Sequence, residues 1–119
     1  MLAGTACTIY GDGTQTRDYV FVEDVARANL LAARTGFAGA VNVGTGVETD
    51  VNQVLAIMAS AAGVEAEPRY APGRAGEQKR SCIDPGMAWD VLGWSPRVAV
   101  ADGLFRTVDF FRTARKAAV

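Results

Sequence analysis

A glycine-rich turn near the start of the chain most limits how the sequence can fold. Residues 8–10, Thr-Ile-Tyr, favour a β-strand, and Gly11-Asp12-Gly13 follows them. Glycine adopts positive φ without steric cost, so this segment predicts a tight turn. Residues 18–22 alternate in polarity and predict a second strand that forms a hairpin with the first. The chain therefore has to reverse before its first helix begins.

Arg17 lies where this turn gives way to the second predicted strand. We expect the strand to fix the base of the side chain while its charged head points outward. A guanidinium held in this way suits bidentate binding of a phosphate or a carboxylate. The residues also allow an exposed ion pair of Arg17 with Asp12 or Asp18, which would have no binding role.

Composition limits the class of protein. The chain has 119 residues, of which 50% are hydrophobic and 21% are charged, so it predicts one packed domain rather than a disordered segment. The net charge is −1 and the basic residues are scattered, which argues against nucleic-acid binding. No apolar run approaches the ~20 residues of a membrane span, and no signal peptide opens the sequence. We expect a cytoplasmic protein that binds neither nucleic acid nor membranes.

The chain contains no histidine, which removes histidine-based nucleophilic and metal chemistry. Cys7 and Cys82 are far apart and fit no metal-binding or redox spacing, so we expect free thiols and no metal site. Any catalysis would have to depend on carboxylates, lysine, tyrosine or a cofactor.

The rest of the sequence alternates between helical and extended patterns. Local signals support the helices: Asp50 and Gln53 form a capping-box pattern, Asp84-Pro85 is typical of a helix start, and Gly36, Gly63 and Gly93 are typical helix ends. The predicted elements after the hairpin are a helix over 23–35, a strand over 40–43, a helix over 51–62, an edge strand over 65–70, a helix over 85–92 and a helix from 102. This order predicts an α/β fold with a small sheet and flanking helices.

Helical spacing also predicts which side chains are buried. The first helix has Val25, Ala28, Leu31 and Ala32 on one face, and the second has Val51, Val54, Leu55, Met58 and Ala62. The third helix has Met87, Ala88, Val91 and Leu92, and the last has Leu104, Phe105, Val108 and Phe111. Trp89 and Trp94 are both expected in the core, with Trp94 folded back on the last turn of the third helix.

Four segments carry a family resemblance. They are Gly11-Asp-Gly-Thr-Gln-Thr-Arg-Asp-Tyr-Val-Phe-Val-Glu-Asp-Val25, Asn42-Val-Gly-Thr-Gly46, Arg74-Ala-Gly-Glu77 and Leu92-Gly-Trp-Ser-Pro96. In this order and spacing they resemble the C-terminal part of the NAD-dependent nucleotide-sugar epimerases and dehydratases, the extended short-chain dehydrogenases. Within that family the details are most similar to 4-epimerases of UDP-sugars. The resemblance covers nearly the whole chain.

The resemblance implies roles for five residues. Arg17 and Arg74 match the two arginines that hold the diphosphate of a UDP-sugar, and Glu77 matches an acidic residue that accepts hydrogen bonds from the ribose hydroxyls. Tyr19 matches a residue beside the nucleotide with a more structural role, and Gln15 is a candidate for a polar contact in the same loop. The sequence also allows an ion pair of Glu77 with Lys79 or Arg80.

Asp24 and Asn42, which lie in the segments that carry the resemblance, are interpreted as structural residues. Asp24 is expected to act as a helix-start carboxylate rather than as a ligand contact. Asn42 is expected to form a hydrogen bond with a neighbouring loop.

The family's catalytic pair has no match in this sequence. It consists of a tyrosine followed four positions later by a lysine, whereas Tyr10, Tyr19 and Tyr70 are followed by Thr14, Glu23 and Arg74. The Val43–Gly46 turn resembles the beginning of a dinucleotide fingerprint, but Thr49 occupies the position of its third glycine. We therefore expect no catalytic residue and no bound cofactor in this chain.

The resemblance implies that residues 1–119 form a nucleotide-sugar substrate-binding domain without the N-terminal Rossmann domain, and that NAD binds in the complete enzyme. The isolated chain is expected to be inactive and to form a homo-oligomer, because surfaces that face the Rossmann domain would be exposed. A stand-alone nucleotide-binding or association module is the alternative. Within the family, a dehydratase or another epimerase also fits.

Overall fold

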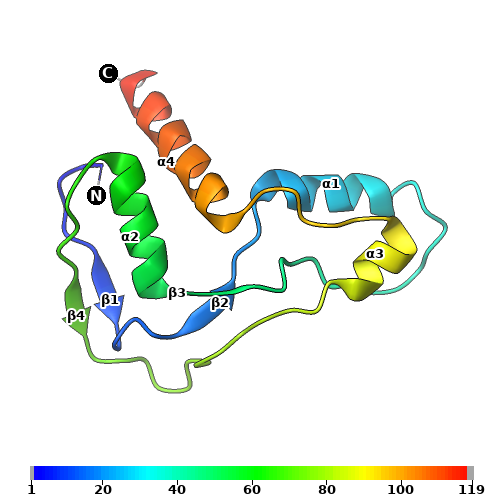
Figure 1. Cartoon of the computed structure of the whole chain (residues 1–119), viewed down its shortest axis with the longest axis horizontal. Helices are drawn as coiled ribbons and strands as arrows, with labels where there is room; N and C mark the ends of the chain where they lie inside the picture. The colour runs from blue at the N-terminus through cyan, green and yellow to red at the C-terminus, as the bar shows by residue number, and fades with distance from the viewer. Residues whose placement is uncertain (1, 118–119) are drawn as a thin grey trace.

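The structure is a computed structural model that describes residues 2–117. Its elements are β1 (Thr8–Tyr10), β2 (Thr16–Asp18), α1 (Val22–Ala32), β3 (Glu48–Asp50), α2 (Val51–Ala62), β4 (Arg69–Ala71), α3 (Gly86–Leu92) and α4 (Val100–Ala117). The chain spreads into a flat shape of 48 × 39 × 19 Å, with α1 and α3 at one end and β1 and β4 at the other (Figure 1). The predicted order of elements and the α/β class are confirmed.

The strands form two small sheets instead of one. β1 pairs with β4 in parallel, with Ile9 opposite Tyr70, and β2 pairs with β3 in antiparallel orientation, with Arg17 opposite Thr49. The predicted hairpin between the first two strands is therefore wrong. The main chain of Gly11 (φ 78°) donates a hydrogen bond of 2.9 Å to Ala71 and so extends the β1–β4 pairing, after which the chain turns toward a different partner.

Three strand positions also differ from the sequence prediction. The second strand covers residues 16–18 instead of 18–22, and the fourth covers 69–71 instead of 65–70. No strand forms over residues 40–43; β3 lies at 48–50. Val41 and Val43 pack against the core from an irregular segment, so their hydrophobicity reflects burial and not strand pairing.

The helix ends follow the local signals in most cases. Asp50 caps α2 by accepting a hydrogen bond from the main chain of Gln53, whose side chain accepts one from the main chain of Asp50, and Gly63 ends the helix at φ 68°. Gly93 ends α3 at φ 62°. The α1 helix ends at Ala32, before the predicted stop at Gly36, and α4 begins at residue 100, two positions early.

The start of α3 also lies one position later than predicted. Pro85 is the N-cap residue, so the helix begins at Gly86. Asp84 nevertheless serves this end of the helix, because its Oδ1 accepts a hydrogen bond of 2.9 Å from the main chain of Gly86.

The main hydrophobic cluster lies between α1 and α3. It contains Ala28, Ala88, Leu92 and Trp94, and Trp94 is completely buried. The indole nitrogen of Trp94 donates a hydrogen bond of 2.8 Å to the main-chain oxygen of Asp24, which satisfies its polar atom in the core. The predicted burial of Trp94 is confirmed.

Trp89 is 62% exposed, so its predicted place in the core is wrong. The same correction applies to Ala32, Met87, Phe105 and Phe111, which are all exposed. Only one face of α3 meets α1, and Ala88 and Leu92 fill it. The α4 helix lies beside α2 and packs mainly against it through the buried Val108, which leaves Phe105 and Phe111 exposed (Figure 1).

Asp24 joins α1 to the segment before α4. Its carboxylate accepts hydrogen bonds from the side chain of Arg27 at 2.7 Å and from the main chains of Arg97 and Val98 at 2.9 and 3.0 Å. Burial raises the pKa of this carboxyl, but the hydrogen bonds outweigh burial and hold the pKa below its ordinary value. Asp24 lies in the first turn of α1, as predicted, and it also fixes a tertiary contact.

No helix among residues 2–117 is both long enough and apolar enough to cross a lipid bilayer.

Candidate functional site

Arg17 lies in the middle of β2, and its guanidinium faces the segment that follows β4. Nη1 donates hydrogen bonds of 2.7 Å to the main-chain oxygens of Thr16 and Gln78, and Nη2 lies 3.5 Å from Oε1 of Glu77. The side chains of Arg17 and Glu77 are each 32% exposed. The guanidinium is thus oriented by two carbonyl groups and remains accessible to a ligand.

The alternative pairing of Arg17 with a neighbouring aspartate is not observed. Asp12 lies 3.5 Å from Lys79, and Asp18 accepts hydrogen bonds from other loops. The alternative pairing of Glu77 with Lys79 or Arg80 is not observed either, because Arg80 pairs with Glu48 at 3.0 Å.

The segment around residues 77–80 is fastened along β2. The main chain of Thr16 donates a hydrogen bond of 3.0 Å to the carbonyl of Lys79, and the Arg80 side chain bonds to both carboxylate oxygens of Glu48 on β3. These hydrogen bonds lower the pKa of Glu48 and raise that of Arg80. The strand carrying Arg17 and the loop carrying Glu77 therefore form one surface.

Arg74 begins the same loop and lies over an aromatic ring. Its Cζ is 4.4 Å from the centre of the Tyr10 ring, and its main-chain oxygen accepts a hydrogen bond of 3.2 Å from Glu77. Gly76, at φ 77°, allows the tight turn between these residues. The main chain of this turn therefore links Arg74 to the pair of Arg17 and Glu77, while the Arg74 guanidinium itself contacts Tyr10.

Gln15 and Tyr19 take other positions. Gln15 is only 9% exposed, and its side-chain nitrogen donates a hydrogen bond of 2.9 Å to the main-chain oxygen of Tyr10. Gln15 thus fastens the end of the turn to β1. Tyr19 lines a groove of about 280 Å³ between the segment after β2 and α4, which includes Leu104. No hydrogen bond or ion pair joins Tyr19 to the arginine group in residues 2–117.

Asp18 ends β2 directly after Arg17, and its carboxylate binds two other segments of the chain, a role that the sequence did not predict. Its Oδ1 accepts hydrogen bonds from the main chain and hydroxyl of Thr45 at 2.7 and 2.6 Å, and its Oδ2 accepts from the main chains of Gly46 and Ile83 at 2.8 and 3.3 Å. Burial raises the pKa of Asp18, but these hydrogen bonds outweigh burial and lower the pKa overall. A side chain at residue 44 would crowd this carboxylate, because a Cβ on Gly44 would lie 2.8 Å from Oδ2.

Two further observations concern the surroundings of the site. Hydrogen bonds from the hydroxyl and the main chain of Thr14 lower the pKa of Asp12 to about 2, so its carboxylate stays charged beside Lys79. Asn42 donates a hydrogen bond of 3.3 Å to the main-chain oxygen of Asp84, which confirms its predicted contact with a neighbouring loop.

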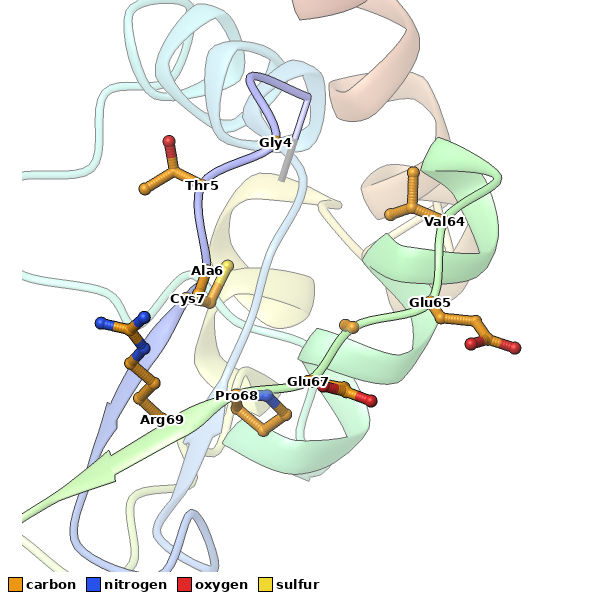
Figure 2. A pocket seen from close by; sticks show the side chains of 10 residues that line it. Gly4, Thr5, Ala6, Cys7, Val64, Glu65, Glu67, Pro68 and Arg69 are labelled. Atoms are coloured by element: carbon orange, nitrogen blue, oxygen red, sulfur yellow. The ribbon is translucent and has the colours of Figure 1, made fainter.

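A separate pocket of about 520 Å³ lies between the segment before β1 and the connection from α2 to β4. Figure 2 shows Cys7 and Arg69 on one side of this pocket and the side chains of Glu65 and Glu67 directed away on the other. None of the five predicted site residues lines this pocket. Within residues 2–117, no group of three or more acidic or cysteine side chains is arranged to hold a metal ion, and both cysteines are free thiols.

Comparisons with known proteins show which family this chain resembles. The model of the NAD dependent epimerase/dehydratase family matches residues 1–44. UDP-glucose 4-epimerase of Mycolicibacterium smegmatis is 47% identical over 113 residues, which are 94% of this chain and 36% of that protein. The chain thus spans about a third of the length of this curated relative.

Solved structures show the same relationship. The UDP-glucose 4-epimerase of Thermotoga maritima, crystallised with UDP-glucose, superposes with a TM-score of 0.91 at 44% identity over 96% of this chain and 37% of that one. The Thermus thermophilus enzyme, in complex with NAD, gives a TM-score of 0.88 at 41% identity over 95% of this chain and 37% of that one. These matches confirm the resemblance to the NAD-dependent epimerase/dehydratase family, and the chain is similar to the C-terminal part of its UDP-glucose 4-epimerases.

Proposed function

We propose that residues 1–119 form the nucleotide-sugar-binding part of a UDP-glucose 4-epimerase-like protein, with Arg17 and Arg74 binding the diphosphate. The observation that carries this proposal is the orientation of Arg17 by the main-chain oxygen of Gln78 at 2.7 Å. This contact joins β2 to the loop that carries Arg74 and Glu77. Two guanidiniums that reach the same diphosphate supply the directional hydrogen bonds and the charge that it requires.

The contact between Arg17 and Glu77 leaves room for a ligand. The two side chains are partly exposed and lie 3.5 Å apart, so solvent screening makes the pair weak. A phosphate can therefore bind Arg17 while Glu77 turns to accept hydrogen bonds from the ribose hydroxyls. Binding energy from the diphosphate would then serve to orient the sugar at a distant reacting carbon.

We also propose that NAD binds outside this chain. The turn over 43–46 is the segment most like a dinucleotide fingerprint, but its amide groups at Thr45 and Gly46 already donate to Asp18 at 2.7 and 2.8 Å. A pyrophosphate would have to displace that carboxylate. NAD, when bound in the complete enzyme, would supply the hydride chemistry at C4 of the sugar.

We propose that an N-terminal Rossmann domain supplies the NAD site and the Tyr-x-x-x-Lys pair, so that residues 1–119 alone do not catalyse epimerisation. Detectable turnover of UDP-galactose by the purified chain with added NAD would contradict this statement.

Homo-oligomer formation is part of the same proposal. Large apolar side chains are exposed on three helices, including Leu30, Trp89 and Phe110 at 60, 62 and 66%. Exposed apolar surface favours association. Light scattering over a range of concentrations tests this, and a monomer at every concentration would refute it.

Titration calorimetry with UDP tests the binding proposal. Arg17→Ala and Arg74→Ala should each weaken UDP binding at least about tenfold, because each removes charge-assisted hydrogen bonds. Arg34→Ala is the matched control, since Arg34 is exposed in the turn after α1 and its loss should leave affinity unchanged. A folded chain that does not bind UDP would favour the association module instead.

Two further titrations refine the ligand. UDP binding tighter than dTDP binding supports a UDP-sugar enzyme over a dTDP-sugar dehydratase, and the reverse preference contradicts it. Glu77→Gln should weaken UDP but leave 2′,3′-dideoxy-UDP binding unchanged, because the analogue lacks the ribose hydroxyls. Equal weakening of both ligands would exclude the ribose role of Glu77.

A further inference from the structure

Tyr10 provides a flat surface on which the Arg74 guanidinium rests. The Arg74 Cζ lies 4.4 Å from the centre of the Tyr10 ring, within the range of a cation–π interaction. Tyr10 ends β1, where the preceding Ile9 is 4% exposed, so strand alternation directs Tyr10 away from the interior. Tyr10 is 43% exposed, so its ring can receive the cation from the solvent side.

The main chain beneath this ring is well fixed. Tyr10 is opposite Ala71 in the parallel pairing of β1 with β4, and its carbonyl oxygen accepts a hydrogen bond of 2.9 Å from the buried Gln15 side chain. The next residue, Gly11, donates to Ala71 at 2.9 Å. Tyr10 is therefore held by the pairing of β1 with β4, and Arg74 follows three residues after the end of β4.

Arg74 has few other constraints. It is exposed, and none of the ion pairs or side-chain hydrogen bonds among the described residues involves its guanidinium. Without the ring, the side chain would sample many rotamers, and ordering it on binding would cost conformational entropy. A guanidinium stacked on a ring keeps the N–H groups at its edge free for bidentate hydrogen bonds.

We propose that Tyr10 is a positioning residue that pre-orients Arg74 to bind the diphosphate of the nucleotide. This inference rests on the proposed function, because it requires Arg74 to bind phosphate. Arg17 is oriented by a hydrogen bond to the carbonyl oxygen of Gln78. Arg74 is oriented by stacking on the ring of Tyr10, so different contacts orient the two guanidiniums.

Affinity for UDP, measured by calorimetry on the full chain, tests the inference through a double-mutant cycle. Tyr10→Leu should weaken UDP binding about two- to fivefold, the range expected from an exposed cation–π contact. Tyr10→Phe retains the ring face and should restore most of the affinity. In the Arg74→Ala background, Tyr10→Leu should cause no further loss.

Tyr70→Leu is the matched control. Tyr70 lies on the neighbouring strand and is 59% exposed, but its hydroxyl bonds to Asn52 and its ring carries no arginine. Tyr70→Leu should leave UDP affinity unchanged. Side-chain NMR gives a second readout: ring currents should shift the Arg74 Hε signal in the wild-type chain, and that shift should disappear in Tyr10→Leu.

The outcomes separate the two proposals. If Arg74→Ala leaves UDP binding unchanged, the proposed function of Arg74 fails. If Arg74→Ala weakens binding but Tyr10→Leu does not, or if Tyr10→Leu still weakens binding when Arg74 is absent, the positioning role is wrong. In the last case Tyr10 would contact the ligand directly, and uridine binding would weaken as well.

Discussion

Nη1 of Arg17 donates a hydrogen bond of 2.7 Å to the main-chain oxygen of Gln78, a residue 61 positions later in the chain. This contact brings a strand and a loop together, although β2 pairs only with β3. The position of the Arg17 guanidinium consequently depends on its hydrogen bond to this carbonyl group. We therefore expect a change in the shape of the side chain to weaken ligand binding even where the charge is kept.

Arg17→Lys tests this dependence. Lysine keeps the charge but lacks the planar fork that can contact two carbonyls and a ligand together. We expect UDP to bind about tenfold more weakly, equivalent to ~1.4 kcal/mol. Calorimetry measures this loss. Arg34→Lys, the same change at an exposed site, should have no effect, and an Arg17→Lys chain with wild-type affinity would show that charge alone suffices.

Asp24→Asn should destabilise the fold. The substitution leaves an amide where a carboxylate accepts hydrogen bonds from Arg27, Arg97 and Val98. The loss of a buried charge-assisted network predicts a decrease of about 2–4 kcal/mol in the free energy of unfolding, measured with urea. Asp90→Asn, at an exposed position of α3, is the matched control. Equal stabilities for the two variants would refute the anchoring role of Asp24.

Stability should decrease in acid. The pKa values of Asp18, Asp24 and Glu48 are lowered in the folded chain, so these carboxylates stabilise the fold above their unfolded pKa, and this contribution disappears as the pH falls through the folded pKa. We expect a constant free energy of unfolding from pH 7 to about pH 5 and a decrease below that. Urea unfolding at several pH values measures this. Stability that rises on acidification would contradict the assignment, and Asp24→Asn should flatten the decrease.

Gly13→Ala should lower the thermal stability of the chain more than Gly63→Ala does. Both glycines have positive φ, at 76° and 68°, so alanine is strained at either position. A Cβ at residue 13 would also lie 2.3 Å from Oδ1 of Asn52, whose side chain bonds to the Asp12 carbonyl and the Tyr70 hydroxyl, whereas a Cβ at residue 63 meets nothing within 4 Å. We expect Gly13→Ala to lower the midpoint of thermal unfolding by several degrees more. Equal midpoints would show that Asn52 moves without cost.

Local signals in the sequence predicted the helices better than the strands. The capping box of Asp50 and Gln53 and the stop at Gly93 depend on neighbouring residues, so the sequence contains all the information they require. The partner of β1 lies about sixty residues later, and nothing near residues 8–10 identifies it. The apolar run over 40–43 illustrates the same limit, because burial against a helix and pairing in a sheet both favour apolar side chains.

The site likewise contains residues that the sequence could indicate and a contact that it could not. The family resemblance indicated Arg17, Arg74 and Glu77; the structure places Arg17 beside Glu77 and joins Arg74 to Glu77 by a main-chain hydrogen bond. The carbonyl oxygen of Gln78 could not be predicted, because a main-chain acceptor has no characteristic side chain. The exposure of Trp89 beside the complete burial of Trp94 depends on which face of a seven-residue helix meets α1, and helical spacing alone does not determine that face.

The most direct test of the account is a two-dimensional amide NMR spectrum of the chain, recorded with and without UDP. The account predicts a dispersed spectrum in which the signals of Arg17, Arg74 and Glu77 shift as UDP is added, while those of Arg34 and Asp90 do not. A dispersed spectrum that UDP leaves unchanged would contradict the central claim that this surface binds a nucleotide diphosphate.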